Sequence, residues 1–437
     1  MQEPIKLNDK RTTNGWCMYD WANSVYSLTI TTAIFPIYYE AVTTANDGSK
    51  LVNFFGWSLP NTVLYSYALS ASFLITALLI PLLSGMADYS GRKKSFLRFF
   101  AYFGALACAG MFMFTGENVE FGILMSVLAS IGYSSSLVFY DAFLPEIATE
   151  DRFDKLSAKG YSLGYLGGVI LLIINLLVIQ MPGLFGIPDG TLPSRIAFVT
   201  VAIWWVGFAS YSLNRLPSNP FNKKAEGGWL LNGYRELSKV YSQIRRLPQM
   251  QRFVLGFFFY NAGVQAVMYL ASLFGAKELK METGELIMTV LIIQLVAIGG
   301  AYAFAHLSKL KGNIYSIVTM ILIWIFVCVL AFFVNASIQF YGLAFLVGLI
   351  MGGIQSLSRA TFSKLIPKDT TDHASYFSFY DVTFNVSIVF GTLAYGMIEH
   401  LTGSMRYSAL GLSVFFIIGF LLVRRTKMQS STTNIAK

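Results

Sequence analysis

The sequence predicts an all-α membrane protein with twelve transmembrane helices in two pseudo-symmetric six-helix bundles. Three observations support this: a shortage of charge, twelve apolar runs of membrane length, and similarity between the two halves. Only 13% of the 437 residues are charged and 55% are hydrophobic, whereas soluble domains carry about 25% charged residues. The mean hydropathy of +0.57 agrees with a polytopic membrane protein.

The apolar runs set the domain organisation, because each is near the length that crosses about 30 Å of hydrocarbon. They lie at 15–43, 61–84, 96–115, 119–144, 158–180, 195–214, 252–275, 284–306, 314–335, 338–363, 374–400 and 405–423. The long polar segment 215–251 separates the sixth run from the seventh and contains an expected surface helix around 234–246. We therefore predict a six-helix bundle at 1–214, a cytoplasmic linker at 215–251 and a second six-helix bundle at 252–437.

The distribution of positive charge predicts the orientation. With both termini inside, the cytoplasmic segments hold 26 of the 32 Lys and Arg residues, and the other face holds five. Such an excess marks the cytoplasmic side. The net charge of +9 is thereby accounted for by topology, and we expect no nucleic-acid partner. The polar start, 1–13, lacks the short apolar core of a cleaved signal peptide.

The two halves resemble each other in their fourth and tenth predicted spans. Phe121-Gly122 opens one and Tyr341-Gly342 opens the other, at an offset of 220 that later glycine and serine positions keep. Related six-helix halves suit a secondary transporter that rocks around a central site. Chance similarity between apolar segments is the alternative.

A short charged loop joins the second and third spans, with the sequence Gly85-Met-Ala-Asp-Tyr-Ser-Gly-Arg-Lys-Lys94. Its glycines allow close backbone approach and positive φ, and Asp88 suits the positive end of a helix dipole. A basic stop after a membrane span is the plainer interpretation. The whole pattern resembles the loop between helices 2 and 3 of the major facilitator superfamily.

Five further stretches are similar to one branch of that superfamily, the vacuole effluxer or autophagy-related permease-like family. They are Tyr19-Asp-Trp-Ala-Asn-Ser-Val-Tyr26, Ala142-Phe-Leu-Pro-Glu-Ile147, Ser162-Leu-Gly-Tyr-Leu-Gly-Gly168, Gly352-Gly-Ile-Gln-Ser-Leu-Ser-Arg359 and Phe377-Ser-Phe-Tyr-Asp381. The resemblance implies the major facilitator fold and secondary transport, with amino acid efflux as in fungal members. Ala262 stands where that family often has an acid, so a coupling role of that acid is not expected here.

Six polar residues are the candidates for substrate binding, because the resemblance implies that spans 1, 4, 7 and 10 line the cavity. They are Asn23, Tyr26, Asn261, Gln265, Gln355 and Ser358. Their amides and hydroxyls suit the carboxylate and ammonium of a zwitterion. The alternative for each is a structural hydrogen bond between helices, worth about 0.6 kcal/mol.

Six charged residues are the candidates for coupling or gating: Asp20, Asp88, Arg92, Asp141, Arg359 and Asp381. A charge at the centre of a membrane helix costs about 3 kcal/mol and calls for a partner or an aqueous cavity. We hypothesise a switchable ion pair between Asp381 and Arg359, with a permanent structural pair as the alternative. The family resemblance implies that Asp88 meets the start of span 11 and that Arg92 approaches Asp141 or Glu146.

The function that fits these features is a secondary transporter of a small polar solute, such as an amino acid, by alternating access and in the direction of efflux. Alternatives are a multidrug or lipid-like exporter and a non-transporting membrane sensor. We expect no enzyme activity, cofactor or metal, because the histidines form no ligand cluster and no nucleotide-binding loop is present. Expected partners are the solute, the lipid bilayer and a coupling proton, with a monomer in the plasma or inner membrane of a prokaryote or the vacuolar membrane of a fungus.

Overall fold

The computed structural model describes residues 6–45, 49–188, 190–218 and 229–428, and long helices dominate it. The helical elements of the first half are α1 (Lys10–Val25), η1 (Tyr26–Ile34), α2 (Phe35–Thr43), α3 (Asn61–Ser90), α4 (Lys93–Gly110), η2 (Met111–Met113), α5 (Val119–Asp141), α6 (Leu144–Ile147), η3 (Glu150–Arg152), α7 (Phe153–Gln180), η4 (Pro182–Phe185) and α8 (Leu192–Leu213). Those that follow are α9 (Trp229–Ile244), α10 (Pro248–Glu278), α11 (Thr283–Lys311), α12 (Asn313–Phe333), α13 (Ser337–Leu365), α14 (His373–Thr402) and α15 (Met405–Arg424).

Twelve helical segments correspond to the twelve predicted spans. In the described part of the chain, eleven single helices are long and apolar enough to cross a membrane. The twelfth span is the uninterrupted run of α1, η1 and α2, which carries a π-helical stretch in its centre. The predicted fold class, an all-α membrane protein of twelve transmembrane helices, is therefore confirmed.

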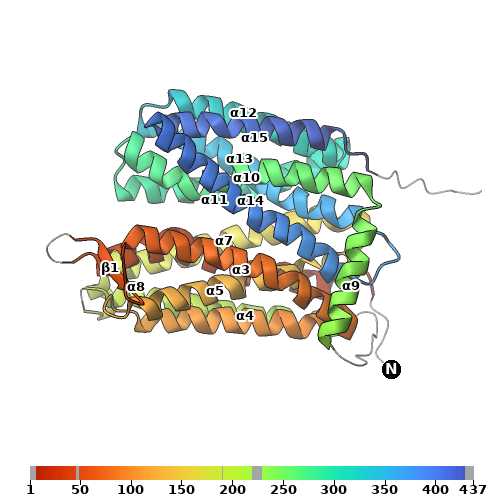
Figure 1. Ribbon diagram of the computed structural model, residues 1–437, viewed down its shortest axis with the longest axis horizontal. Helices are drawn as coiled ribbons and strands as arrows, with labels where there is room; N and C mark the ends of the chain where they lie inside the picture. Colours follow the sequence, from red (N-terminus) through yellow and green to blue (C-terminus); the bar gives the residue numbers. More distant parts are fainter. Residues whose placement is uncertain (1–5, 46–48, 189, 219–228, 429–437) are drawn as a thin grey trace, which may run out of the picture.

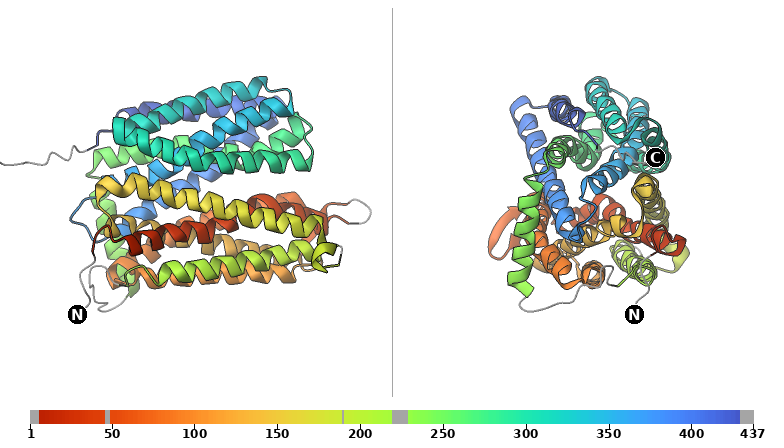
Figure 2. Two further views of the ribbon diagram at one scale, coloured as in Figure 1. Left: turned by 180° about the vertical axis from the view of Figure 1, so that it is seen from behind. Right: turned by 90° about the vertical axis from the view of Figure 1, so that its right-hand side faces the viewer.

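The helices form two groups that lie side by side (Figure 1). We call α1–α8 the amino-terminal group and α10–α15 the carboxyl-terminal group. Helix α1 begins and helix α15 ends at the same end of the molecule, which we call the termini end (Figures 1 and 2). Helix α9 crosses this end from one group to the other, within the segment where the sequence predicts a surface helix; positions 219–228 of the predicted linker lie outside the described residues.

The loop between α3 and α4 is as tight as its sequence predicts. Helix α3 ends at Ser90 and α4 begins at Lys93. Gly91 takes φ +65°, a left-handed conformation that favours glycine at a helix C-terminus. Gly85 meets the backbone of Gly233 on α9, so that a side chain on Gly85 would collide with the Gly233 carbonyl. The first glycine of the motif thus serves close packing against α9, and the second allows the turn.

Close packing of α1 on α7 positions the first acid of the site. A side chain on Gly160 would collide with the Asp20 carboxylate, and one on Gly164 would collide with the Ser24 hydroxyl. Small residues at this spacing let membrane helices approach closely and gain van der Waals contact. The glycines of α7 thus allow its close packing on α1.

Three local features differ from the sequence prediction. The first helix begins at Lys10 rather than at 15, because Asp9 caps it by accepting a hydrogen bond from the Thr12 amide at 2.8 Å. Strands β1 (Leu51–Phe54) and β2 (Trp57–Pro60) form an antiparallel hairpin where only a loop was expected, at the end opposite the termini (Figure 1). The π-helical stretch η1 was not predicted.

Candidate functional site

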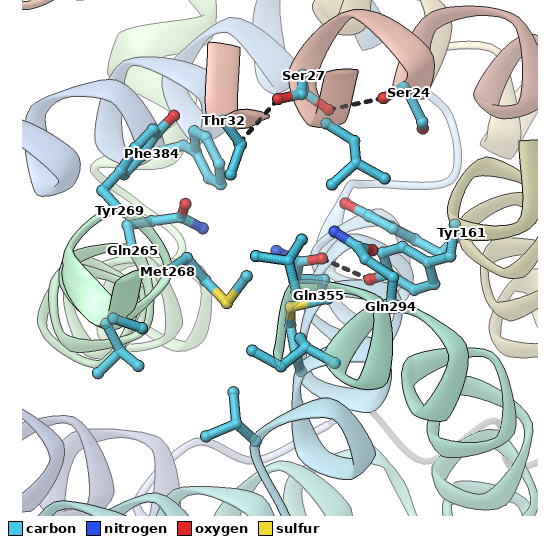
Figure 3. Close-up of a pocket in the computed structure, with 18 of the residues that line it drawn as sticks. Ser24, Ser27, Thr32, Tyr161, Gln265, Met268, Tyr269, Gln294, Gln355 and Phe384 are labelled. Atoms are coloured by element: carbon cyan, nitrogen blue, oxygen red, sulfur yellow. Dashed lines mark hydrogen bonds between the residues drawn. The ribbon is translucent and has the colours of Figure 1, made fainter. Parts of the chain in front are cut away.

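A cavity of about 260 Å³ lies between the two helix groups and receives side chains from both (Figure 3). Seven of the twelve sequence-predicted site residues line it: Asp20, Asn23, Asp141, Gln265, Gln355, Arg359 and Asp381. Spans 1, 4, 7 and 10, which the family resemblance implies as the lining, all contribute as α1, α5, α10 and α13. Helices α3, α7, α11, α12 and α14 contribute as well. The charged and amide side chains thus come together although they are far apart in sequence.

Arg359 on α13 is the centre of the polar wall. Its guanidinium donates to Asp20 Oδ2 at 3.1 Å and to Asp141 Oδ1 at 3.0 Å, both across the boundary between the groups. It also donates to the hydroxyl of Ser157 at 2.9 Å and to the Ser157 carbonyl at 3.1 Å. A guanidinium with its donors held in this way is buried without unsatisfied charge.

Aromatic rings enclose the same guanidinium. Its carbon lies 4.8 Å from the Trp16 ring centroid, 4.2 Å from that of Tyr161 and 5.4 Å from that of Tyr140. Tyr140 also donates its hydroxyl to Asp20 at 2.8 Å. Cation–π contacts gain strength when desolvated, so the rings and carboxylates together hold Arg359 at the junction of the two groups.

The hypothesised ion pair between Asp381 and Arg359 is wrong for this conformation. Arg359 is bound to Asp20 and Asp141, whereas Asp381 accepts a hydrogen bond from the Asn385 amide at 2.8 Å, one turn along α14. The prediction assumed that adjacent spans carry the closest opposite charges. In the fold, the acids nearest to Arg359 belong to the other helix group.

The cavity therefore contains more negative than positive side chains. Among the described residues that line it, Arg359 is the cation and Asp20, Asp141 and Asp381 are the acids. Arg359 engages the first two, and a neutral amide engages the third. Because an unpaired charge is costly away from water, this surplus favours binding of a proton or of a positively charged group of a solute.

Amide side chains line the remainder of the polar wall (Figure 3). Gln355 accepts the hydroxyl of Tyr165 at 2.6 Å, and Gln265 donates to Asn261 at 3.2 Å. The buried Nδ2 of Asn23 and the buried Oε1 of Gln294 have no protein hydrogen-bond partner, which leaves a donor on α1 and an acceptor on α11.

Five of the predicted site residues lie outside the cavity lining. Tyr26 points into a separate small pocket and shares a hydrogen bond of 2.9 Å with Ser130. Asn261 donates to Ser387 at 2.6 Å, and Ser358 bonds Tyr260 at 2.7 Å. These three side chains form structural hydrogen bonds within their own helix group, which was the alternative to substrate binding. The other two residues, Asp88 and Arg92, lie at the termini end.

The termini end is held shut by polar contacts between the groups. Asp88, at the end of α3, accepts the amides of Ala374 at 3.2 Å and Ser375 at 2.6 Å in the first turn of α14. The expected contact between Asp88 and the start of span 11 is therefore present, and the dipole of α14 favours the carboxylate there. Arg92 is exposed at the start of α4, and its neighbour Lys93 pairs with Glu146 in the place proposed for Arg92.

Further polar contacts reinforce this closure. Glu146 also bonds His373 of α14 at 2.9 Å. Asp154 accepts Lys364 Nζ at 2.9 Å and the hydroxyl of Ser308 at 2.9 Å, both from the carboxyl-terminal group. These contacts lie at the ends of α3, α7, α13 and α14 that are nearest the termini. The conformation is therefore closed at the termini end.

Several lining residues escaped the sequence analysis. Tyr161, Tyr165, Gln294 and Asn385 line the cavity from α7, α11 and α14. The signal that was available is that Gln294 and Asn385 are amides inside apolar spans. The tyrosines gave no signal, because aromatic residues are common throughout this chain. In the described chain, no group of three His, Cys, Asp or Glu side chains is arranged to hold a metal ion.

Solved structures share the architecture of this chain. A crystal structure of the major facilitator transporter FucP in the outward conformation matches with a TM-score of 0.71 at 13% identity, over 96% of this chain and 98% of that one. The human organic anion transporter MFSD10 matches with a TM-score of 0.72 at 12% identity, over 96% and 100%. The fold is that of a major facilitator superfamily transporter.

Sequence comparisons identify the branch. The family model described as "Vacuole effluxer Atg22 like" matches residues 8–436, and the chain belongs to this family. The MFS-type transporter YxiO of Bacillus subtilis (strain 168) is 31% identical over 96% of this chain and 95% of its own. Autophagy-related protein 22 of Yarrowia lipolytica (strain CLIB 122 / E 150) is 24% identical over 85% and 77%. The protein is a multi-pass membrane transporter of the MFS type, as the sequence predicts.

Proposed function

We propose that the chain is a secondary transporter that exports a small polar solute, an amino acid or a related metabolite, by alternating access. The observation that carries this proposal is the cavity between the two helix groups, whose charged wall is shared by Asp20, Asp141 and Arg359. The moving units are the bundles 1–214 and 252–437. The description of the family as vacuole effluxers supports export.

The chemistry of the cavity supports a zwitterion. The Asn23 amide offers an unpartnered donor for a carboxylate, and Gln294 offers an unpartnered acceptor for an ammonium group. The surplus of acids over cations in the lining favours a positively charged group on the solute. The volume of about 260 Å³ is below the roughly 300–1,000 Å³ of pockets that hold drug-sized ligands.

We propose that Asp381 exchanges the coupling proton. Its hydrogen bond comes from Asn385 rather than from a cation, and it lines the cavity that the solute enters. Arg359 serves instead as part of the closure, because its partners Asp20 and Asp141 lie in the other group. Opening of the termini end separates these pairs and exposes the charges to the solute and to water.

The distribution of positive charge supports an orientation with both termini in the cytoplasm, since the segments on the side of the termini hold 26 of the 32 Lys and Arg residues. The higher identity to the Bacillus subtilis relative favours the cell membrane of a bacterium over a vacuolar membrane. We propose a monomer as the functional unit, with both helix groups that enclose the cavity contributed by one chain.

A multidrug or lipid-like exporter is the second candidate. The observation in its favour is the apolar part of the wall, formed by Phe73, Met268, Phe274, Phe340 and Phe384. The two candidates differ in what competes for transport. An amphipathic dye competes with the solute for transport by a multidrug exporter, but it does not compete for transport by an amino acid transporter.

Counterflow in proteoliposomes tests both. Purified protein is reconstituted with unlabelled amino acids inside, and uptake of labelled ones is followed with and without a pH gradient. We expect saturable exchange of at least one amino acid, with accumulation that depends on the gradient. Asp381→Asn is expected to keep exchange and to lose the accumulation, whereas Asp369→Asn, an exposed acid at the termini end, keeps both. Transport of dyes without exchange of amino acids would transfer the assignment to the second candidate.

A further inference from the structure

Helix α9 contacts both helix groups at the termini end, where it lies at the perimeter and runs across the direction of the spanning helices (Figures 1 and 2). On the α3 side it is fixed by the close approach of Gly233 to Met86 and by the fully buried Val240. Because these contacts are tight, α9 is attached firmly to the amino-terminal group.

On the other side, α9 is bound to α14. Lys239 Nζ lies 2.9 Å from Asp372 Oδ2 just before α14, and the hydroxyl of Tyr376 donates to Gln243 at 2.9 Å. Burial lowers the pKa of Lys239, but the hydrogen bonds to Glu236 and Asp372 outweigh it and raise this pKa above its ordinary value. Lys239 is therefore charged at neutral pH, and α9 links the two groups in the closed conformation.

The outward face of α9 is apolar, and basic residues follow at its carboxyl end. Leu231, Tyr234 and Tyr241 recur at helical spacing on one face and are 59%, 63% and 52% exposed. Exposed arginines accompany this stripe, with Arg245 over the Tyr241 ring at 5.9 Å between centre and centroid. Arg246 follows Arg245 and is also exposed.

This pattern is typical of a helix that lies in a membrane interface, with apolar side chains at the acyl boundary and cations at the headgroups. The positive charge of this face is complementary to an anionic lipid surface. Each Lys or Arg near an anionic bilayer strengthens binding of the helix to it on the order of fivefold. The position of α9 beside the ends of the membrane-spanning helices puts the stripe at the level of the headgroups.

We propose that the outward face of α9 binds anionic phospholipid headgroups and that this binding stabilises the conformation closed at the termini end. Lipid bound to α9 holds the helix in the orientation from which Lys239 and Gln243 reach α14. Without lipid on this face, the end of α9 that carries Lys239 and Gln243 is held less well, so these two contacts weaken and the groups separate more readily. The proposal adds regulation by lipid to the transport cycle and does not depend on which solute is carried.

The test uses the full-length protein in lipid nanodiscs. Spin labels are placed at Lys10→Cys, at the start of α1, and at Arg424→Cys, at the end of α15, and both positions are exposed. The distance between the two labels reports the separation of the helix groups at the termini end. The three native cysteines are buried and do not compete for the label. Distances are measured in discs of phosphatidylcholine alone and in discs in which one lipid in three is phosphatidylglycerol.

We expect the anionic lipid to raise the ratio of closed to open molecules at least threefold in the otherwise unchanged protein. The double variant Arg245→Gln/Arg246→Gln is expected to lose most of this shift while matching the parent in neutral discs. The matched control Lys309→Gln/Lys311→Gln removes the same charge from α11 at the same end and is expected to keep the shift. Soluble glycerol phosphate added to neutral discs is expected to have no effect.

A second readout separates binding from closure. A spin label at Ser238→Cys, in the middle of the exposed stripe, is expected to lie at the headgroup and acyl boundary in anionic discs. An equal shift of the closed ratio in the arginine variant and the parent would overturn the proposal. A Ser238 label that remains fully accessible to water in anionic discs would also overturn it and would point to a protein partner or a solvated face.

Discussion

Arg359 on α13 joins the two helix groups through its ion pairs with Asp20 and Asp141. It lies at the end of a fairly specific sequence motif, and its guanidinium reaches two acids of the opposite group while three aromatic rings surround it. On this pairing we propose that Arg359 is part of the closure. Asp381, which the sequence linked to it, faces the same cavity with a neutral partner.

Removal of the Arg359 charge tests this assignment. Arg359→Gln leaves Asp20 and Asp141 buried without a cation, which costs about 3 to 5 kcal/mol. We expect a lower unfolding temperature in detergent and loss of transport. The triple variant Asp20→Asn/Asp141→Asn/Arg359→Gln is expected to recover thermal stability. If the single variant is as stable as the parent, the three residues do not form the buried cluster described here.

Gly160 supplies a second test at the same scale. Gly160→Ala places a methyl group where the Asp20 carboxylate lies, and overpacking of this kind costs about 1 to 3 kcal/mol. Gly207→Ala on α8 is the matched control, because a methyl group there meets no neighbouring atom within 4 Å. Thermal unfolding of the two variants is expected to differ clearly, and equal stabilities would contradict the close packing of α7 on α1.

At the scale of elements, the contact between α3 and α14 is the main polar closure. Asp88 accepts two amides from the first turn of α14, where the helix dipole favours a negative charge. Lys93, Glu146 and His373 form a second contact between the same groups. We therefore propose that the short loop that supplies Asp88 and Lys93 acts on the conformational equilibrium rather than on the solute.

Asp88→Asn is expected to weaken the closed conformation by about 1.5 kcal/mol, since hydrogen bonds to a charged group are worth about 1.5 to 3 kcal/mol. That is about a tenfold fall in the ratio of closed to open molecules. Labelling of introduced cysteines at the termini end should become faster and the transport rate should fall. Asp151→Asn, an exposed acid nearby, is the control. Unchanged labelling with loss of solute binding would assign Asp88 to the binding site instead.

At the scale of the whole molecule, the sequence predicts the spans well because a membrane requires long apolar helices. The contact of Asp88 with the start of α14 was expected from the family resemblance, which the short motif 85–94 carries. The hairpin at 51–60 escaped because its strands are only four residues long and its turn, Phe55-Gly56, lacks the Asn-Gly or Asp-Gly pair typical of such turns. The π-helical stretch η1 escaped because a change from four- to five-residue hydrogen bonding leaves little trace in composition.

The partner of Arg359 was mispredicted for a different physical reason. Depth in the membrane can be inferred from the position in a span, but the face that one bundle turns toward the other cannot. Residues from α1, α5 and α13 meet only after both bundles have folded and docked. The same limit applies to Tyr26, Asn261 and Ser358, whose polar groups are satisfied within their own bundles.

The central claim, that transport requires the termini end to open and close, is tested most directly by a reversible crosslink across it. Lys368 Nζ lies 3.1 Å from Glu150 Oε2 at the outer edge of this closure, and both side chains are accessible. The variant Glu150→Cys/Lys368→Cys is joined with a short reducible bis-thiol reagent in proteoliposomes. We predict that exchange stops when the crosslink forms and returns when it is reduced, whereas each single-cysteine variant is unaffected by the reagent. Undiminished exchange by the fully crosslinked protein would contradict the account.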